Sequence, residues 1–485
     1  MSNEKQKAIF GIGWTTVSTA FTMLAQILRV VILTRFLGKS DFGIVAMVNV
    51  VIGFCTTFGD LGFASVIMYR QKLEKEEFSS LYWVQFLVFS FLYLAIVLLS
   101  DIISSSYGEP LLGKLIPISA LSILFLAIGK LYDSVLQKRY EFKTLAVRSI
   151  ISNALSLVLA VYLACAGYGF YSLIISTLFQ LLFYNIWNLV AGYKMQPVCF
   201  HLNLSSEIIR LLKMGLYQTL TRVLDFVSTK VDILLIGSYL GTDALGVYDL
   251  AKELVQKLVN LVKTIVSSVA LPFLSNSNTD DKLVISRYYI ITKVVAYVCF
   301  PICIITAVFS KPIVEIMYGK SFIDAYPLVA IFSIMTMINS IASFFDMLGI
   351  SKGRTDLNLY NTLIRVFFTI PVIWICCQFS LNIVALGHLL LALALFFVIW
   401  VMIARKTYNL SIVEYYHQFN QLLFVFIPYS VMFYVVRYIL FGYYIEETLE
   451  TNLNMFVVYI LVLLPIAYYG LNSDLNSLLK RIRQK

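Results

Sequence analysis

The sequence contains fourteen apolar runs, each long enough to cross a lipid bilayer as a helix. An α-helix needs about 20 residues to cross the hydrocarbon core. The runs cover residues 10–36, 42–68, 79–100, 111–132, 144–167, 169–192, 210–238, 244–272, 288–309, 325–348, 357–378, 382–404, 420–441 and 453–470. None has the alternating pattern of a membrane β-strand. The sequence therefore predicts an all-α membrane protein with about 14 transmembrane helices.

The composition excludes several classes of soluble protein. Of the 485 residues, 60% are hydrophobic and only 13% are charged, whereas soluble proteins have about 25% charged residues. A soluble enzyme, a secreted disulfide scaffold and a disordered chain are therefore disfavoured. The seven cysteines show neither metal-ligand spacing nor a disulfide framework. We expect no metal and no cofactor.

The distribution of basic residues predicts the orientation of the chain in the membrane. With the N-terminus inside, the cytoplasmic loops and tails contain 21 Lys and Arg, and the opposite loops contain 4. By the positive-inside rule, both termini are cytoplasmic. The formal net charge of +10 then reflects topology and needs no nucleic acid partner. The basic loops are expected to attract anionic membrane lipids.

An internal repeat predicts two similar helical lobes. Residues 36–43 resemble residues 239–246 at an offset of 203, and Tyr132-Asp133 resembles Phe345-Asp346 at an offset of 213. An offset of six spans makes the repeats parallel, with an axis along the membrane normal. We expect a six-helix lobe at 1–192, a cytoplasmic linker at 193–209 and a second six-helix lobe at 210–404. Residues 405–485 would form two extra helices and a basic cytoplasmic tail.

Charged residues inside the spans predict a polar central cavity between the lobes. A charge at the bilayer centre costs about 2.5–3.5 kcal/mol on insertion scales, so charged stripes face protein or water. The most charged stripe lies in 244–272 and comprises Asp249, Lys252, Glu253, Lys257 and Lys263. An alternative is that the polar faces only join helices. Arg148, near the inner end of its span, is expected to snorkel to the interface.

These residues form three candidate functional groups. A phosphate-bearing, anionic substrate would meet Arg222 and Lys257, with Lys252 and Arg365 as helpers. Asp225 and Glu253 are the candidates for loading a proton or sodium ion, although Glu253 and Lys257 could simply neutralise each other. Under the offset of 203, the oppositely charged pairs Arg29–Asp232 and Asp60–Lys263 predict an outer and an inner gate. The alternative is that each charge pairs within its own lobe.

Several segments together resemble one transporter family. They are 33–38 with 41–43, Gly59-Asp60-Leu61-Gly62-Phe63, Arg70-Gln71 followed by 79–83, Leu271-Pro272, and 318–327. With these segments the chain resembles Wzx-type polysaccharide flippases of the multidrug/oligosaccharidyl-lipid/polysaccharide exporter superfamily. In the segment 318–327, Ser321 separates the basic residue from the aromatic Phe322, which departs slightly from the family pattern.

The resemblance implies a function. It implies that the protein moves an undecaprenyl-diphosphate-linked oligosaccharide from the cytoplasmic to the periplasmic leaflet of the bacterial inner membrane, for surface polysaccharide or lipopolysaccharide biosynthesis. It also implies ion-coupled alternating access, in the manner of an antiporter, and the absence of a phosphate-binding Gly-x-x-x-x-Gly-Lys-Ser/Thr loop agrees. The diphosphate would then meet the candidate cations.

Three other functions remain open. A cation-coupled multidrug exporter of the same superfamily would favour an acidic cavity, which the basic residues of 244–272 disfavour. A membrane glycosyltransferase, polymerase or ligase would need a sizeable outer loop with convergent acids. Glu446, Glu447 and Glu450 cluster in the loop 442–452 without a basic or nucleophilic partner. A membrane scaffold would explain none of the charges inside the spans.

Overall fold

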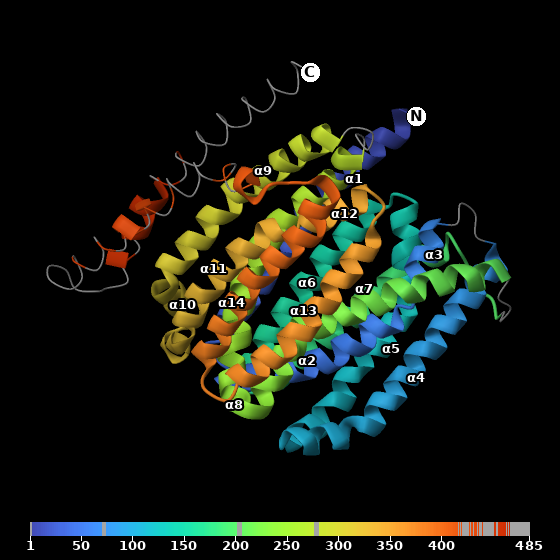
Figure 1. Cartoon of the computed structure of the whole chain (residues 1–485). Helices are drawn as coiled ribbons and strands as arrows, with labels where there is room; N and C mark the ends of the chain where they lie inside the picture. Colours follow the sequence, from blue (N-terminus) through green and yellow to red (C-terminus); the bar gives the residue numbers. More distant parts are fainter. Residues whose placement is uncertain are drawn as a thin grey trace. The chain divides into compact units, whose positions relative to one another are not determined.

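The computed structural model describes residues 2–69, 74–200, 206–275 and 281–415, and beyond these only short runs and single residues up to 465. Every regular element in the described ranges is a helix (Figure 1). Ten described segments are long and apolar enough to cross a membrane, and they coincide with predicted spans one to six and nine to twelve. The prediction of an all-α membrane protein is confirmed. The basic tail and the acidic loop 442–450 lie outside the described residues, and the count of fourteen spans stays a prediction.

Contacts divide the chain into two compact units, Met1–Asp249 and Leu250–Lys485. The long helix α8 (Ser206–Ser275) contains predicted spans seven and eight; its residues 206–249 belong to the first unit and 250–275 to the second. A boundary between sequence repeats need not coincide with a boundary between groups of contacts. The lobe limits at 192 and 210 therefore stay a prediction.

The first unit is organised around α5. Besides the first half of α8, it comprises α1 (Ser2–Leu33), α2 (Lys39–Gly59), α3 (Phe63–Tyr69), α4 (Lys75–Tyr107), α5 (Pro110–Lys138), α6 (Phe142–Cys165) and α7 (Tyr171–Tyr193). Helix α5 packs against α2, α3, α4 and α7, and α1 packs against α6. Large apolar side chains, among them Phe78 and Tyr132, are fully buried where α3, α4 and α5 meet. This core supports the C-terminal part of α5.

The second predicted span, 42–68, is broken into two helices. Helix α2 ends at Gly59, and α3 starts at Phe63. Between them, Leu61 has φ 38° and Gly62 has φ 74°, in the left-handed region that favours glycine. A Cβ on Gly62 would lie 2.2 Å from the Cα of Gly215 in α8. The motif 59–63 thus makes a bend that fits closely against another backbone, and Asp60 lies in the bend.

A second close contact joins the two turns that the repeat relates. A Cβ on Gly43 would lie 1.9 Å from the carbonyl oxygen of Thr242, and a Cβ on Gly246 would lie 2.0 Å from that of Lys39. Gly43 and Gly246 are related by the repeat offset of 203, and so are Lys39 and Thr242. The two contacts are therefore equivalent under the repeat. The two turns therefore meet about a local two-fold axis. Gly241, with φ 83°, makes the break inside α8.

The second unit repeats the contact pattern of the first. It comprises the second half of α8 and α9 (Asp281–Val308), α10 (Ser310–Tyr318), η1 (Lys320–Ala325), α11 (Tyr326–Ala342), α12 (Phe345–Ser351), α13 (Thr355–Cys376), α14 (Leu381–Ile399), η2 (Trp400–Arg405) and α15 (Lys406–Tyr408). Helix α11 packs against α9 and α14, as α5 packs against α4 and α7.

Individual contacts follow the repeat as well. The ring centroids of Phe78 and Tyr132 are 5.3 Å apart, and those of Tyr288 and Phe345 are 5.8 Å apart. Tyr132 and Phe345 are the matched aromatic residues of the sequence repeat, and both are fully buried. The duplication read from the sequence is therefore present in the packing of each unit.

The described residues of the last two predicted spans pack onto α9 through aromatic rings. Phe309, next to the end of α9, contacts Phe433, Phe456 and Tyr459, with ring centroids 5.3–5.8 Å apart. Tyr459 is completely buried. Edge-to-face aromatic pairs of this kind add to the free energy gained from burial alone. These described residues near the C-terminus are thus part of the second unit's core.

Candidate functional site

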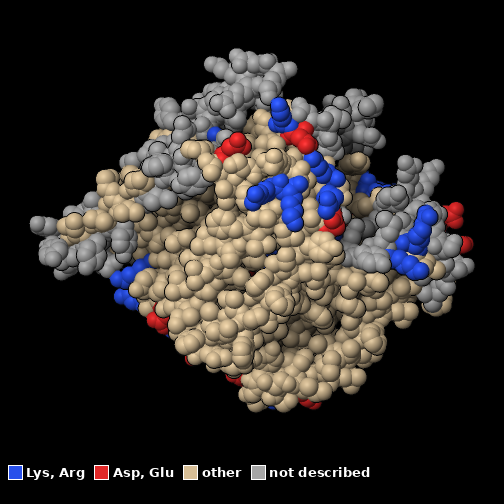
Figure 2. Space-filling model, in the orientation of Figure 1, with Lys and Arg blue, Asp and Glu red and all other residues tan. Residues whose placement is uncertain are grey.

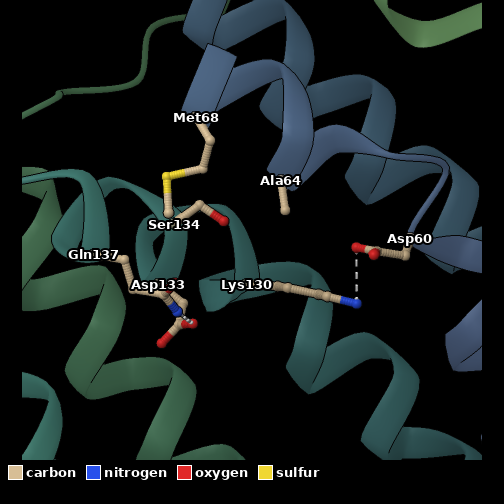
Figure 3. Close-up of a pocket in the computed structure, with 7 residues that line it drawn as sticks. All are labelled: Asp60, Ala64, Met68, Lys130, Asp133, Ser134 and Gln137. Atoms are coloured by element: carbon tan, nitrogen blue, oxygen red, sulfur yellow. Dashed lines mark hydrogen bonds and ion pairs between the residues drawn. The ribbon is translucent and has the colours of Figure 1, made fainter. Parts of the chain in front are cut away.

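Asp60 is the centre of a charged cluster inside the first unit. Its side chain is only 10% exposed. Arg222 Nη1 of α8 donates a 2.8 Å hydrogen bond to Asp60 Oδ2. Lys130 Nζ of α5 lies 3.0 Å from Asp60 Oδ1 (Figure 3). One acid thus joins the α2–α3 bend to two cations from different helices.

A second ion pair lies one turn further along α5. Arg148 of α6 is only 3% exposed, and its Nη1 lies 2.7 Å from Asp133 Oδ1. The guanidinium also donates to Asn188 and to the hydroxyl of Tyr184, whose ring lies under it. The expectation that Arg148 snorkels to the interface is therefore wrong. Partners on α5 and α7 satisfy its charge inside the bundle.

A pocket of about 580 Å³ connects the two ion pairs. Figure 3 shows Ala64 and Met68 of α3 on one side and side chains of α5 on the other. Its complete lining is Asp60, Ala64, Met68, Lys130, Asp133, Ser134 and Gln137. Gln137 Nε2 donates a 2.7 Å hydrogen bond to Asp133 Oδ2. The pocket is polar on the α5 side and apolar on the α3 side.

Helix geometry explains why these α5 residues gather. Lys130, Asp133, Ser134 and Gln137 follow one another at steps of three, one and three, so they occupy one face of the helix. The opposite face contributes the buried Leu131 and Val135 to the core with α3 and α4. Packing on one side of α5 therefore turns its polar residues toward the pocket.

The predicted substrate-binding residues fall in both units. Arg222 is 57% exposed beyond its contact with Asp60. In the second unit, Lys252 is buried and Lys257 Nζ lies 2.7 Å from Glu253 Oε1. That ion pair is the one expected from the i,i+4 spacing. The gathering of Lys252, Lys257 and Arg365 around the same ligand as Arg222 stays a prediction, and so does the ion-loading role of Asp225 and Glu253.

The two predicted gates also stay predictions. Arg29 donates to the Leu173 carbonyl, Ser176 Oγ and Thr177 Oγ1 near the start of α7, at 2.7–2.9 Å. Asp232 accepts hydrogen bonds from its neighbour Ile233 N and from the hydroxyl of Tyr248. For the second gate, Lys263 donates to the carbonyl of Asn339 at 3.1 Å. Asp60 is engaged by Arg222 and Lys130, as described above.

Sequence reasoning missed the α5 and α6 members of the cluster. Lys130 and Asp133 are charged residues at the end of an otherwise apolar run, a pattern that marks functional or paired groups in membrane helices. The sequence repeat also pointed to Asp133, because it matches an acid in the second copy. Asp133 and Asp346 are matched residues, and Asn361, which is Arg148 shifted by 213, donates to Asp346 Oδ1 at 3.5 Å. The two acids have equivalent partners, one charged and one neutral.

The surface fits a lipid environment. Figure 2 shows large stretches of surface on the visible face without Lys, Arg, Asp or Glu. Large apolar side chains such as Phe91, Leu98 and Val158 are more than two-thirds exposed. Some basic residues also have structural roles, since Lys138, the last residue of α5, donates to the Ile67 carbonyl near the end of α3. Cations at helix C-termini stabilise the helix dipole.

Residues 32–327 match the family model for polysaccharide biosynthesis proteins. The chain belongs to this family. The matched region contains the α2–α3 bend, all of α8 and every residue of the pocket. The resemblance to Wzx-type flippases is confirmed, and with it the classification as a membrane transporter and not an enzyme.

Similar proteins support the same classification. The chain is 25% identical to the teichuronic acid biosynthesis protein TuaB of Bacillus subtilis, over 74% of each chain. It is 22% identical to the lipopolysaccharide biosynthesis protein WzxC of Escherichia coli, over 80% of this chain and 78% of that protein. Both are polysaccharide biosynthesis proteins by name.

Solved structures show the same fold. The lipid II flippase MurJ in an inward closed conformation has a TM-score of 0.76 and 17% identity, over 94% of this chain and 98% of that one. An inward-facing MATE family multidrug transporter has a TM-score of 0.61 and 14% identity, over 80% of this chain and 96% of that one. The expected superfamily fold is therefore present.

Proposed function

We propose that the protein flips an undecaprenyl-diphosphate-linked oligosaccharide from the cytoplasmic to the outer leaflet of the bacterial inner membrane. Membership of the polysaccharide biosynthesis family over residues 32–327 is the observation that supports this most directly. The charge of the loops supports a cytoplasmic position for both termini. The Asp60 pocket then opens near the cytoplasmic ends of α2 and α5, where a lipid-linked sugar made in the cytoplasm would arrive.

The chemistry of the described cations suits the diphosphate of such a substrate. Arg222 uses one nitrogen for Asp60 and exposes more than half of its side chain. A guanidinium offers several donors in a fixed plane, so it can hold a carboxylate and a phosphate together. Lys257, Lys252 and Arg365 remain the proposed helpers.

Transport is proposed to be driven by an ion gradient through alternating access of the two lobes. Asp225 and Glu253 are the proposed loading sites for a proton or sodium ion. The pairing of Glu253 with Lys257 supports such a role, because protonating the acid would release the lysine for an anionic substrate. Transport in proteoliposomes that is unaffected by collapse of both the proton and the sodium gradient would exclude it.

A direct test uses the purified chain in proteoliposomes. The probe is undecaprenyl diphosphate bearing the host's own repeat unit with a fluorescent label on the sugar, and a membrane-impermeant quencher reports the leaflet. We expect the wild-type chain to expose the label on both sides, and the Arg222→Ala variant to do so much more slowly. A wild-type chain that leaves the label in its starting leaflet would refute the proposal.

The second candidate is a cation-coupled multidrug exporter, which the likeness to the MATE fold favours. The cations around Asp60 and in the second half of α8 argue against a cationic drug. Efflux of ethidium from cells that express the chain, abolished by Asp225→Asn, would favour this alternative over the flippase.

A further inference from the structure

The two carboxylates in the wall of the Asp60 pocket make it a poor site for a diphosphate. Asp60 and Asp133 both line the pocket, and a diphosphate placed there would bring further negative charge beside them. Lys130 is the cation in the pocket wall, and it already forms an ion pair with Asp60. Like charges at short range repel strongly where water is partly excluded. The pocket therefore favours a ligand without negative charge.

The same wall offers acceptors for hydroxyl groups. Asp60 Oδ1 is enclosed beside Lys130 Nζ, which lies 3.0 Å away. The side chain of Asp133 is 24% exposed, so its carboxylate is the acceptor that a ligand can reach. Gln137 donates its amide nitrogen to Asp133 and is exposed, which leaves its amide oxygen accessible to a ligand. Hydrogen bonds from hydroxyls to carboxylates are charge-assisted and strong. A ligand with several adjacent hydroxyls matches this arrangement.

The opposite wall offers an apolar surface. Met68 is 47% exposed, and Ala64 lies beside it on α3 (Figure 3). A thioether adapts its shape to irregular apolar faces. A pyranose ring has hydroxyls around its edge and C–H groups on its faces, so it can bind acceptors on one side and an apolar wall on the other. The volume of about 580 Å³ lies within the range of small-ligand pockets.

We propose that this pocket binds an uncharged sugar ring of the substrate, while the diphosphate lies outside it against exposed cations such as Arg222. This inference rests on the proposed flippase function and divides the substrate between two places. Asp60 connects them, because it lines the pocket and its Oδ2 holds Arg222. The sugar would be recognised by α3 and α5 of the first unit.

The test compares the binding of two lipids to the full chain in nanodiscs. One is undecaprenyl diphosphate bearing the host's repeat unit, and the other is undecaprenyl diphosphate alone. We expect wild-type protein to bind the sugar-bearing lipid about tenfold more tightly, which corresponds to about one charge-assisted hydrogen bond. The variants Gln137→Ala, which removes an acceptor, and Ala64→Phe, which fills the pocket, should bring the ratio of the two Kd values close to one.

The controls separate the possible failures. Gln378→Ala changes the same residue type at an exposed position of the second unit and should leave both Kd values unchanged. Equal weakening of both lipids in Gln137→Ala and Ala64→Phe, or a wild-type ratio near one, would overturn the sugar pocket while leaving the flippase function standing. A wild-type chain that binds neither lipid would instead count against the proposed function.

Discussion

Arg222 of α8 reaches Asp60, 162 positions earlier in the chain, and the 2.8 Å contact between them connects the α2–α3 bend to the helix that begins the second sequence repeat. Arg222 was predicted to meet substrate and Asp60 to close a gate. The structure places both in one cluster. A change at Arg222, the proposed substrate contact, can therefore act on the α2–α3 bend through the carboxylate of Asp60.

The first prediction concerns this pair. Asp60→Asn and Arg222→Gln should each reduce export of surface polysaccharide strongly. Arg222→Gln should change the free energy of unfolding by less than ~1 kcal/mol, because the arginine is largely exposed. The double variant should export at least as much polymer as the single variant with the lower export, since the two residues act together. Lys213→Ala, an exposed basic residue of the same helix, is the control. Additive effects on export, measured with an antibody against the polymer, would show that the pair is not coupled.

The second prediction concerns the bend at Gly62. Gly62→Ala should destabilise the protein by ~2–4 kcal/mol, because it adds both backbone strain at positive φ and a clash with Gly215. Gly167 has a similar φ of 82° but open space where its Cβ would lie. Gly167→Ala should therefore show only the strain, about 1–2 kcal/mol. Thermal unfolding in detergent measures both, and equal shifts in Tm would contradict the close contact.

The third prediction compares the matched acids of the two repeats. Asp133→Ala leaves the buried guanidinium of Arg148 without its carboxylate, which should cost ~3–5 kcal/mol. Asp346→Ala removes a carboxylate that accepts a long hydrogen bond from the neutral Asn361, so its cost should be about 1–2 kcal/mol. Denaturant unfolding of the two variants provides the comparison. A larger loss for Asp346→Ala would mean that charge burial is not the main cost.

The fourth prediction concerns the turns that meet about the local two-fold axis. Ser40 Oγ and Thr242 Oγ1 are 3.0 Å apart, so the pair Ser40→Cys and Thr242→Cys should form a disulfide in a background without the native cysteines. If these turns separate during transport, oxidation should stop flipping in proteoliposomes and reduction should restore it. Either single cysteine serves as the control. Full activity of the cross-linked protein would show instead that the turns stay together through the cycle.

The fifth prediction retains the outer gate proposed from the repeat. Arg29→Asp or Asp232→Arg alone should impair export, and the double exchange should restore part of it. Arg29 has hydrogen-bond partners on α7, so the single Arg29→Asp change should also lower Tm. A double variant no better than the worse single variant, with unchanged accessibility of cysteines placed at the two ends of the helices, would rule out the gate.

The sequence predicted the helices well because their signal is local. An apolar run must hydrogen-bond its own backbone in lipid, so its length alone predicts a spanning helix, and ten of the predicted spans coincide with described helices or helix pairs. The repeat was also readable, because matched residues such as Tyr132 and Phe345 keep their buried aromatic packing. The break in the second span was not predicted, since the reason for Gly62 lies in Gly215, 153 positions away.

The sequence by itself thus determined the membrane class, the helical architecture, the duplication and the family. Each depends on the length of apolar runs or on similarity along the chain. Only the tertiary structure decided which charges meet: Asp60 with Lys130 and Arg222, and Asp133 with Arg148. A buried charge requires a partner, but periodicity gives only the face of its own helix. The partner is chosen by the packing of α5 against its neighbours, which brings together residues that are distant in the sequence.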